Sequence, residues 1–207
     1  MEERTGGVWA LLKHANFYTA LQNLLGGPHL RQLIVDNYIC AVPGDRVLDV
    51  GCGPADFAPL IPKVDYLGID RNPDYIRQAR ERYGDRARFL QADVSAEPSQ
   101  IDGSFNVIIA IGLLHHLTDE QSIRLLAATQ RHLAPGGRLL TIDPARTSSQ
   151  NWIAKLIINV DRGRHVRSAL QYEALAHTTY DQVTVEVRTD LLRVPYTHCI
   201  LECRKCA

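Results

Sequence analysis

The sequence predicts an α/β fold, a doubly wound and mostly parallel β-sheet with helices on both faces. Between Arg46 and Pro144, short apolar runs alternate with amphipathic segments, which is the pattern of parallel strands joined by helices. Several of these runs are apolar almost throughout, as expected of central strands buried on both faces. Two more apolar runs close the chain, and the link between them, Arg193–Tyr196, is too short for a helical crossover. These two strands are therefore expected to pair antiparallel.

The parallel part of the sheet is expected to contain five strands. They are predicted at Arg46–Val50, Val64–Ile69, Ala87–Leu90, Ser104–Ile111 and Arg138–Ile142. Two of the helices between them carry terminal signals. Asn72 can cap a helix that has Pro73 at its first position. Thr118 and Gln121 have the spacing of a capping box, and Pro135-Gly136-Gly137 ends the helix that they begin.

Further helices and strands are expected before and after this unit in the chain. Amphipathic helices are predicted at Val8–Leu25, His29–Cys40, Ser148–Val160 and Arg167–Ala176, and the final strands at Gln182–Leu192 and Thr197–Glu202. The helices before the unit are expected to form a lid or a lateral support.

Composition narrows the class of partner. Lys plus Arg and Asp plus Glu both number 23, so there is no basic surplus to neutralise a phosphate backbone, and nucleic acid is disfavoured. The longest apolar stretches, such as Val107–Leu114, are far shorter than the roughly 20 residues of a membrane span. Without a secretory signal at Met1–Val8, we expect a cytoplasmic protein with reduced cysteines. Cys199, Cys203 and Cys206 lack a fourth ligand, so no metal site is expected.

A glycine-containing sequence follows the first predicted strand. Gly51 and Gly53 come directly after Val47–Val50, and backbone without side chains lets a ligand approach closely. A helix is expected next, as in nucleotide-binding turns. Asp70 ends the second strand, where its carboxylate suits both hydroxyls of a ribose, and Asp93 follows the third, where it can accept a hydrogen bond from an adenine amino group. These positions predict a site for a nucleotide-type ligand.

Two more motifs complete a family resemblance. With His115-His116 after the fourth strand and Leu133-Ala134-Pro135-Gly136-Gly137 before the fifth, the chain resembles class I S-adenosylmethionine-dependent methyltransferases over Arg46–Pro144. The nearest group includes ubiquinone and menaquinone methyltransferases. The resemblance implies a Rossmann-like, seven-stranded sheet of order 3-2-1-4-5-7-6 with strand seven antiparallel. It also implies S-adenosyl-L-methionine as cofactor, S-adenosyl-L-homocysteine as product, and in-line methyl transfer to oxygen, nitrogen or carbon of a small-molecule acceptor.

The resemblance also implies a domain layout and a set of cofactor-binding residues. A single domain, 1–207, would comprise a helical lid or support at 1–42, a cofactor-binding core at 43–145, an acceptor-side helical insertion at 146–180 and a terminal hairpin at 181–207. Gly51 and Gly53 would lie under the methionine part, and Asp49 would support the loop or the amino group. Asp70 would hold the ribose, and Asp93 the adenine. The full set is Tyr18, Asp49, Gly51, Cys52, Gly53, Asp70, Arg71, Ala92, Asp93, Val94 and Ala110.

Four residues are candidates for the acceptor side. A hydroxyl or phenol acceptor must lose its proton to a base, and histidine is the usual choice near neutral pH. The candidates are His115 and His116 at the carboxyl edge of the sheet, Asp143 just past the fifth strand, and His165 in the polar insertion. Arg162, Arg164 and Arg167 either grip an anionic acceptor or belong to a solvated loop.

Two alternatives remain at this point. An NAD(P)-binding oxidoreductase is one, because Gly51-x-Gly53 followed by an acid also begins a dinucleotide fingerprint. Against it, Asp56 stands where that fingerprint has its third glycine, and Asp93 has no role there. A non-catalytic adenosyl-binding module is the other. The oligomeric state is open.

Overall fold

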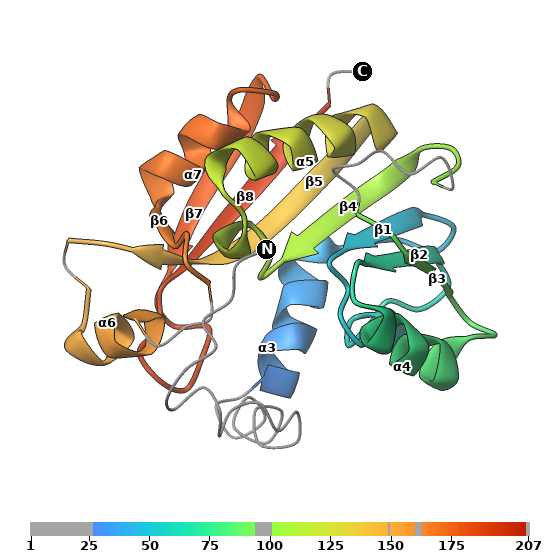
Figure 1. Ribbon diagram of the computed structural model, residues 1–207, viewed down its shortest axis with the longest axis horizontal. Helices are drawn as coiled ribbons and strands as arrows, with labels where there is room; N and C mark the ends of the chain where they lie inside the picture. Colours follow the sequence, from blue (N-terminus) through green and yellow to red (C-terminus); the bar gives the residue numbers. More distant parts are fainter. Residues whose placement is uncertain (1–26, 94–100, 149, 160–162, 206–207) are drawn as a thin grey trace.

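The computed structural model describes residues 27–93, 101–148, 150–159 and 163–205. In these residues one sheet runs in the order β3-β2-β1-β4-β5-β8-β7, with helices on both sides of it (Figure 1). The expected Rossmann-like fold and strand order are confirmed, since β8 and β7 are the seventh and sixth strands of the prediction. A two-residue strand, β6, is added beside the end of β5.

The strands and helices have the following bounds. The strands are β1 Arg46–Val50, β2 Asp65–Asp70, β3 Arg88–Gln91, β4 Phe105–Ile111, β5 Leu133–Arg146, β6 Arg167–Ser168, β7 Gln182–Arg188 and β8 His198–Arg204. The helices are α3 Gly27–Ile34, the π-helix η1 Val35–Ile39, the 3₁₀ turns η2 Ala58–Leu60 and η4 Leu114–His116, α4 Pro73–Tyr83, α5 Asp119–His132, α6 Trp152–Asn159 and α7 Ala169–Ala176.

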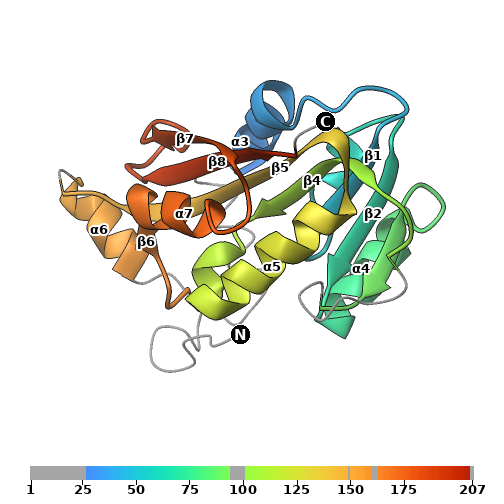
Figure 2. The same ribbon diagram turned by 90° about the horizontal axis from the view of Figure 1, so that it is seen from above.

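Two apolar cores lie on opposite faces of the sheet. On one face, α5 and α7 bury side chains such as Leu126 and Tyr172 against β4, β5 and β8. On the other, α3 and α4 bury Ile34 and Ile76 against β1 and β2. Figure 2 shows this division, with α5 and α7 on one side of the strands and α3 on the other. Burial on both faces explains why the central strands are apolar almost throughout.

Strand direction determines which residues meet at the edge of the sheet. Strands β1 to β5 are parallel, so their carboxyl ends share one edge. Strand β8 is antiparallel to β5, with Pro144 opposite His198 and Asp143 opposite Cys199. The amino end of β8 therefore lies at the same edge, where ligands bind in open α/β sheets.

The predicted signals for the starts of two helices are present, whereas Pro135-Gly136-Gly137, which was expected to end a helix, lies inside β5, because α5 already ends at His132. The Asn72 side chain accepts a hydrogen bond from the Asp74 N–H at the start of α4. Thr118 and Gln121 form a complete capping box at the start of α5. Ser168 and Gln171 form another at the start of α7, so that helix begins at Ala169, and the Arg167 predicted in it lies in β6.

The helix expected after the glycine turn is absent, and this expectation was wrong. Among residues 51–64, only Ala58–Leu60 is helical, as a single 3₁₀ turn. Pro54, Pro59 and Pro62 each lack the N–H that an α-helix needs, and the segment is short. The chain crosses from β1 to β2 through turns instead.

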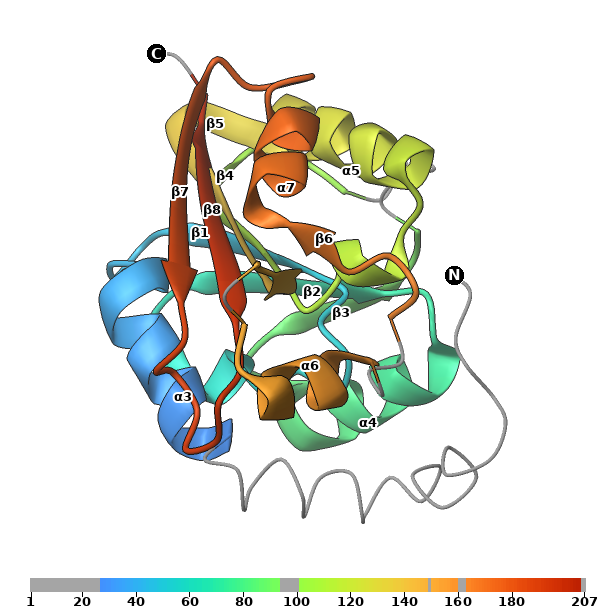
Figure 3. The same cartoon turned by 90° about the vertical axis from the view of Figure 1, so that its left-hand side faces the viewer.

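Two other elements differ from expectation. The link between the hairpin strands spans residues 189–197, because Arg188 pairs with Asp190 and Leu191 is buried in the core instead of continuing β7. In the insertion, α6 is separated from α7 by β6 (Figure 3). In chain order, α6 therefore comes before the pairing of β6 with β5, and α7 comes after it.

Candidate functional site

Asp70 joins the ends of the first three strands. Its Oδ2 accepts a hydrogen bond from the Gly53 N–H at 3.0 Å, and its Oδ1 accepts one from the Asn72 N–H at 2.7 Å. Its backbone carbonyl accepts from the Ala92 N–H at 3.1 Å, just past β3. The side chain is only half-buried. A carboxylate offers about four lone-pair sites, so Asp70 keeps capacity for hydroxyl donors of a ligand.

The glycine turn presents bare backbone beside that carboxylate. Gly51 and Gly53 have φ of +74° and +54°, a region that favours glycine. The Gly51 and Cys52 N–H groups both donate to the Ile69 carbonyl, which fixes the turn against β2. No described atom lies within 4 Å of the place where a Cβ on Gly53 would be. A ligand can therefore approach the Gly53 backbone closely.

Asp49 lies beneath this turn. It is 3% exposed, and its carboxylate accepts a hydrogen bond from the Tyr66 hydroxyl. Burial raises the pKa of Asp49, the Tyr66 hydrogen bond lowers it, and the nearby charges of Asp70 and Asp56 add to the rise, so that the pKa lies at about 7. The Asp49 carboxylate is thus tied to Tyr66 of the neighbouring strand β2.

Asp49→Asn is expected to stabilise the ligand-free protein at pH 8 but not at pH 4. The folded-state pKa is raised, so the folded protein holds this proton more tightly than the unfolded chain. Wild-type stability therefore falls as pH rises from about 4 to about 7 and is constant above that. One pKa unit corresponds to about 1.4 kcal/mol, so the gain in the free energy of unfolding at pH 8 is at most about 4 kcal/mol. Urea unfolding at both pH values measures it, with the exposed Asp74→Asn as control. Equal gains at both pH values would contradict the assignment.

The other predicted cofactor residues divide into three groups. Arg71 and Asp93 are exposed at the ends of β2 and β3, and Ala92 between those ends is half-buried. Cys52 and Ala110 turn their side chains into the core, where burial raises the pKa of the Cys52 thiol, so only their backbone faces the edge. Tyr18 and Val94 lie outside the described residues.

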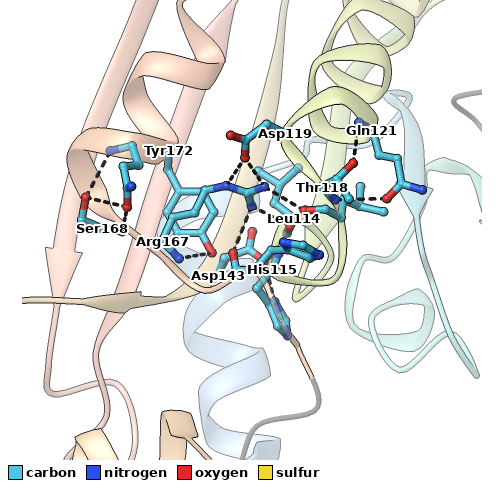
Figure 4. Close-up of polar contacts among 12 residues, drawn as sticks. Leu114, His115, Thr118, Asp119, Gln121, Asp143, Arg167, Ser168 and Tyr172 are labelled. Carbon is cyan, nitrogen blue, oxygen red and sulfur yellow. Dashed lines mark hydrogen bonds and ion pairs between the residues drawn. The ribbon is translucent and has the colours of Figure 1, made fainter. Parts of the chain in front are cut away.

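On the acceptor side, the structure brings His115 and Asp143 together (Figure 4). Asp143 Oδ1 lies 2.8 Å from His115 Nδ1 and also accepts the His115 backbone N–H at 3.1 Å. Both residues are buried, at 6% and 2% exposed. Because a carboxylate only accepts, this contact assigns a proton to His115 Nδ1. Asp143 Oδ2 is buried and has no hydrogen-bond partner among the described residues.

The two remaining candidates lie against this pair. The His116 ring lies tilted against the His115 ring, with centroids 4.1 Å apart. His165 contributes its backbone, since its N–H donates to the His115 carbonyl at 3.0 Å. All four acceptor-side candidates are thus within one cluster at the ends of β4 and β5.

Two residues near this cluster have roles that the sequence did not reveal. Arg167 was grouped with Arg162 and Arg164 as an anion grip or a solvated residue, but it is only 6% exposed and its guanidinium binds backbone carbonyls. Arg164 is exposed, and Arg162 lies outside the described residues. His198 begins β8 at the same edge, its ring tilted 4.8 Å from that of Tyr196. Burial lowers the pKa of His198 to about 4, so it is neutral.

Neither metal ligation nor a membrane span is evident in the part of the chain that the structure describes. No group of three or more His, Cys, Asp or Glu side chains is placed there to hold a metal ion. None of the described helices is long and apolar enough to cross a bilayer.

Comparison with known proteins relates this chain to methyltransferases. The model of a family described as a methyltransferase domain matches residues 47–137. The chain is 34% identical over 127 residues to a probable tRNA methyltransferase 9B of Mus musculus, covering 61% of this chain and 26% of that one. It is 32% identical over 107 residues to a ubiquinone biosynthesis O-methyltransferase of Albidiferax ferrireducens, covering 49% and 42%.

Similarity to solved structures extends over nearly the whole chain. The crystal structure of the S-adenosylmethionine-dependent methyltransferase SibL aligns with a TM-score of 0.75 at 19% identity, covering 97% of this chain and 60% of that one. At this identity the likeness concerns the fold. The chain spans between a quarter and about two-fifths of the length of the two curated relatives.

Proposed function

We propose that this protein, whose residues 47–137 match the model of a methyltransferase domain, is a class I S-adenosylmethionine-dependent enzyme that transfers the methyl group of its cofactor to a small-molecule acceptor. The single observation that carries the proposal is the juxtaposition of bare Gly53 backbone and the Asp70 carboxylate, joined by a 3.0 Å hydrogen bond. S-adenosylmethionine is the cofactor.

The residues at the edge fit that cofactor chemically. The open backbone at Gly53 would accommodate its amino-acid part, and Asp70 would accept hydrogen bonds from the ribose hydroxyls. The exposed Asp93 carboxylate would accept one from the adenine amino group. A cationic sulfonium is also compatible with an edge that carries two carboxylates.

The same geometry disfavours a nicotinamide dinucleotide. Dinucleotide sites place the pyrophosphate at the N-terminus of an α-helix that follows the glycine turn. Here the glycine turn leads only into the 3₁₀ turn Ala58–Leu60. Asp56, at the third glycine position, forms ion pairs with Arg31 of α3 and Arg82 of α4. A pyrophosphate at this turn would thus meet a carboxylate and the two cations that already pair with it, and no helix N-terminus follows within residues 51–64.

On the acceptor side, we assign His115 as general base and Asp143 as the residue that orients it. When bound, S-adenosylmethionine supplies an electrophilic methyl group, so the protein has to align the acceptor and remove its proton. His115 Nε2 would take that proton while Asp143 holds the Nδ1–H. A base in this position favours an acceptor that must lose a proton, a hydroxyl group, over an amine that can react as its free base. The balance of 23 basic and 23 acidic residues favours a small molecule over RNA.

Thermal unfolding with two ligands tests the function. S-adenosylhomocysteine at 100 times its dissociation constant should stabilise the protein by about 2.7 kcal/mol, which raises Tm by about 5–10 °C for a chain of this size. NADH at the same concentration should leave Tm unchanged. Stabilisation by NADH alone would replace the methyltransferase proposal with an oxidoreductase.

A further inference from the structure

A short segment of the insertion covers the His115 turn. Gly163 is buried directly against His115: a Cβ at this position would lie 2.7 Å from the His115 carbonyl oxygen and closer still to ring carbon Cδ2. Two residues later, the His165 N–H donates to the same carbonyl at 3.0 Å. The ring of His115 thus lies between the Asp143 carboxylate and the backbone of this segment, so any side chain at 163 would displace the ring or the segment.

Arg167 fastens the same segment to the turn with all five of its N–H donors. Nη1 donates to the carbonyls of Leu114 at 3.0 Å and His165 at 3.1 Å, and Nη2 donates to that of Leu117 at 2.7 Å. Nε and Nη2 also bind Asp119 Oδ1, at 2.9 and 2.7 Å (Figure 4). Leu114 and Leu117 flank His115 and His116 in the chain.

No anionic ligand is needed to explain Arg167. Its side chain is 7% exposed, and its guanidinium lies 5.6 Å from the Tyr172 ring centroid and is neutralised by Asp119 at the start of α5. A planar fork that binds three carbonyls and a carboxylate fixes the relative position of every group it contacts. A lysine has one nitrogen and cannot reproduce this arrangement.

We propose that Gly163 and Arg167 are positioning residues for His115. Together they hold the turn so that the His115 ring keeps its hydrogen bond to Asp143 and presents Nε2 in one orientation. The inference rests on the proposed function, in which His115 removes the acceptor proton, but it concerns residues that are assigned neither to the proposed cofactor site nor to the proton transfer itself. It also makes the orientation of the base depend on the insertion, which is the part expected to form the acceptor side.

Nitrogen-15 NMR of the histidine rings tests this without any acceptor. In the wild type, His115, assigned by the spectrum of His115→Gln, should show one neutral tautomer with the proton on Nδ1. Gly163→Ala and Arg167→Lys should lose that single tautomer and give a mixture, because ring and carboxylate no longer align. Arg124→Lys is the matched control, since Arg124 is exposed on α5 and forms its ion pair with Glu120 of the same helix; it should keep the wild-type signal.

Calorimetric titration with S-adenosylhomocysteine separates the two proposals. Both variants should bind it with unchanged Kd, which also shows that they are folded, while kcat falls by about 100-fold, as expected of a misplaced catalytic group. Variants that bind the ligand and retain the Nδ1 tautomer would overturn the positioning role. A wild type that fails to bind the ligand would instead overturn the proposed function, whatever the state of the histidine.

Discussion

Replacing Asp70 by alanine is expected to weaken binding of S-adenosylhomocysteine roughly 100-fold. Hydrogen bonds to a charged group contribute about 1.5–3 kcal/mol each, and every 1.4 kcal/mol is a factor of ten in Kd. The substitution removes the proposed acceptor for the ribose hydroxyls and also the acceptor for the Gly53 N–H. The glycine turn therefore loses its tie to the Asp70 side chain at the same time. Isothermal titration calorimetry measures the change directly.

A neighbouring carboxylate provides the control for this experiment. Asp74 lies in the first turn of α4, exposed and paired with Arg77. Asp74→Ala should leave the Kd for S-adenosylhomocysteine unchanged. Urea unfolding of both variants should show that each remains folded. If Asp70→Ala binds as tightly as the wild type, the ribose lies elsewhere, and the placement of the cofactor at this edge is wrong.

Asp143→Asn is expected to reduce kcat by about 10³–10⁴-fold with little change in cofactor affinity. The amide can donate to the imidazole as well as accept from it, so it no longer holds the proton on Nδ1. In an Asp–His pair of a hydrolase, the corresponding change costs about 10⁴-fold through the wrong tautomer. Transfer of a labelled methyl group from S-adenosylmethionine into the compounds of a metabolite extract, followed by mass spectrometry, gives the rate and identifies the acceptor together.

Two control measurements accompany the Asp143→Asn experiment. Asp181→Asn, an exposed substitution just before β7, should keep the wild-type rate. S-adenosylhomocysteine should bind Asp143→Asn as it binds the wild type, because Asp143 lies on the acceptor side of the edge. A variant that turns over at the wild-type rate would remove His115 and Asp143 from the reaction and favour an acceptor that needs no base.

The strands and caps were predictable because their signals are local. Apolar runs flanked by turn residues located every strand of the sheet to within a few residues, apart from the two-residue β6 and the full length of β5. Strand order is a long-range property, and it came from the family resemblance. The helix after Gly53 was predicted by analogy with nucleotide-binding turns, yet three prolines in that segment already argued against it.

The sequence could place those site residues that directly follow a strand. It could not place residues whose role depends on whether their side chain is buried. Asp70 and Asp143 could be placed from the edge rule alone. Arg167 could not, because its partners Leu114 and Leu117 lie about 50 residues away in the chain, and a charged run gives no sign that one member is buried. The place of His198 follows from the antiparallel direction of β8, whose amino end reaches the shared edge; the family resemblance implied that direction, and the hairpin pattern alone did not.

The pairing of β6 with β5 has a consequence for how this fold can change. The chain leaves the sheet after Arg146 and comes back at Arg167, which lies opposite Ala145. The entry and exit of the intervening stretch are therefore neighbours, and the entropy of closing a loop grows only slowly with its length. The stretch between them can therefore change in length at little cost in loop-closure entropy, provided that the buried Gln150, Ala154 and Ile158 keep their contacts. Under the proposed function, selection could vary the acceptor in this way while Gly163 and Arg167, at the point of return, keep His115 aligned.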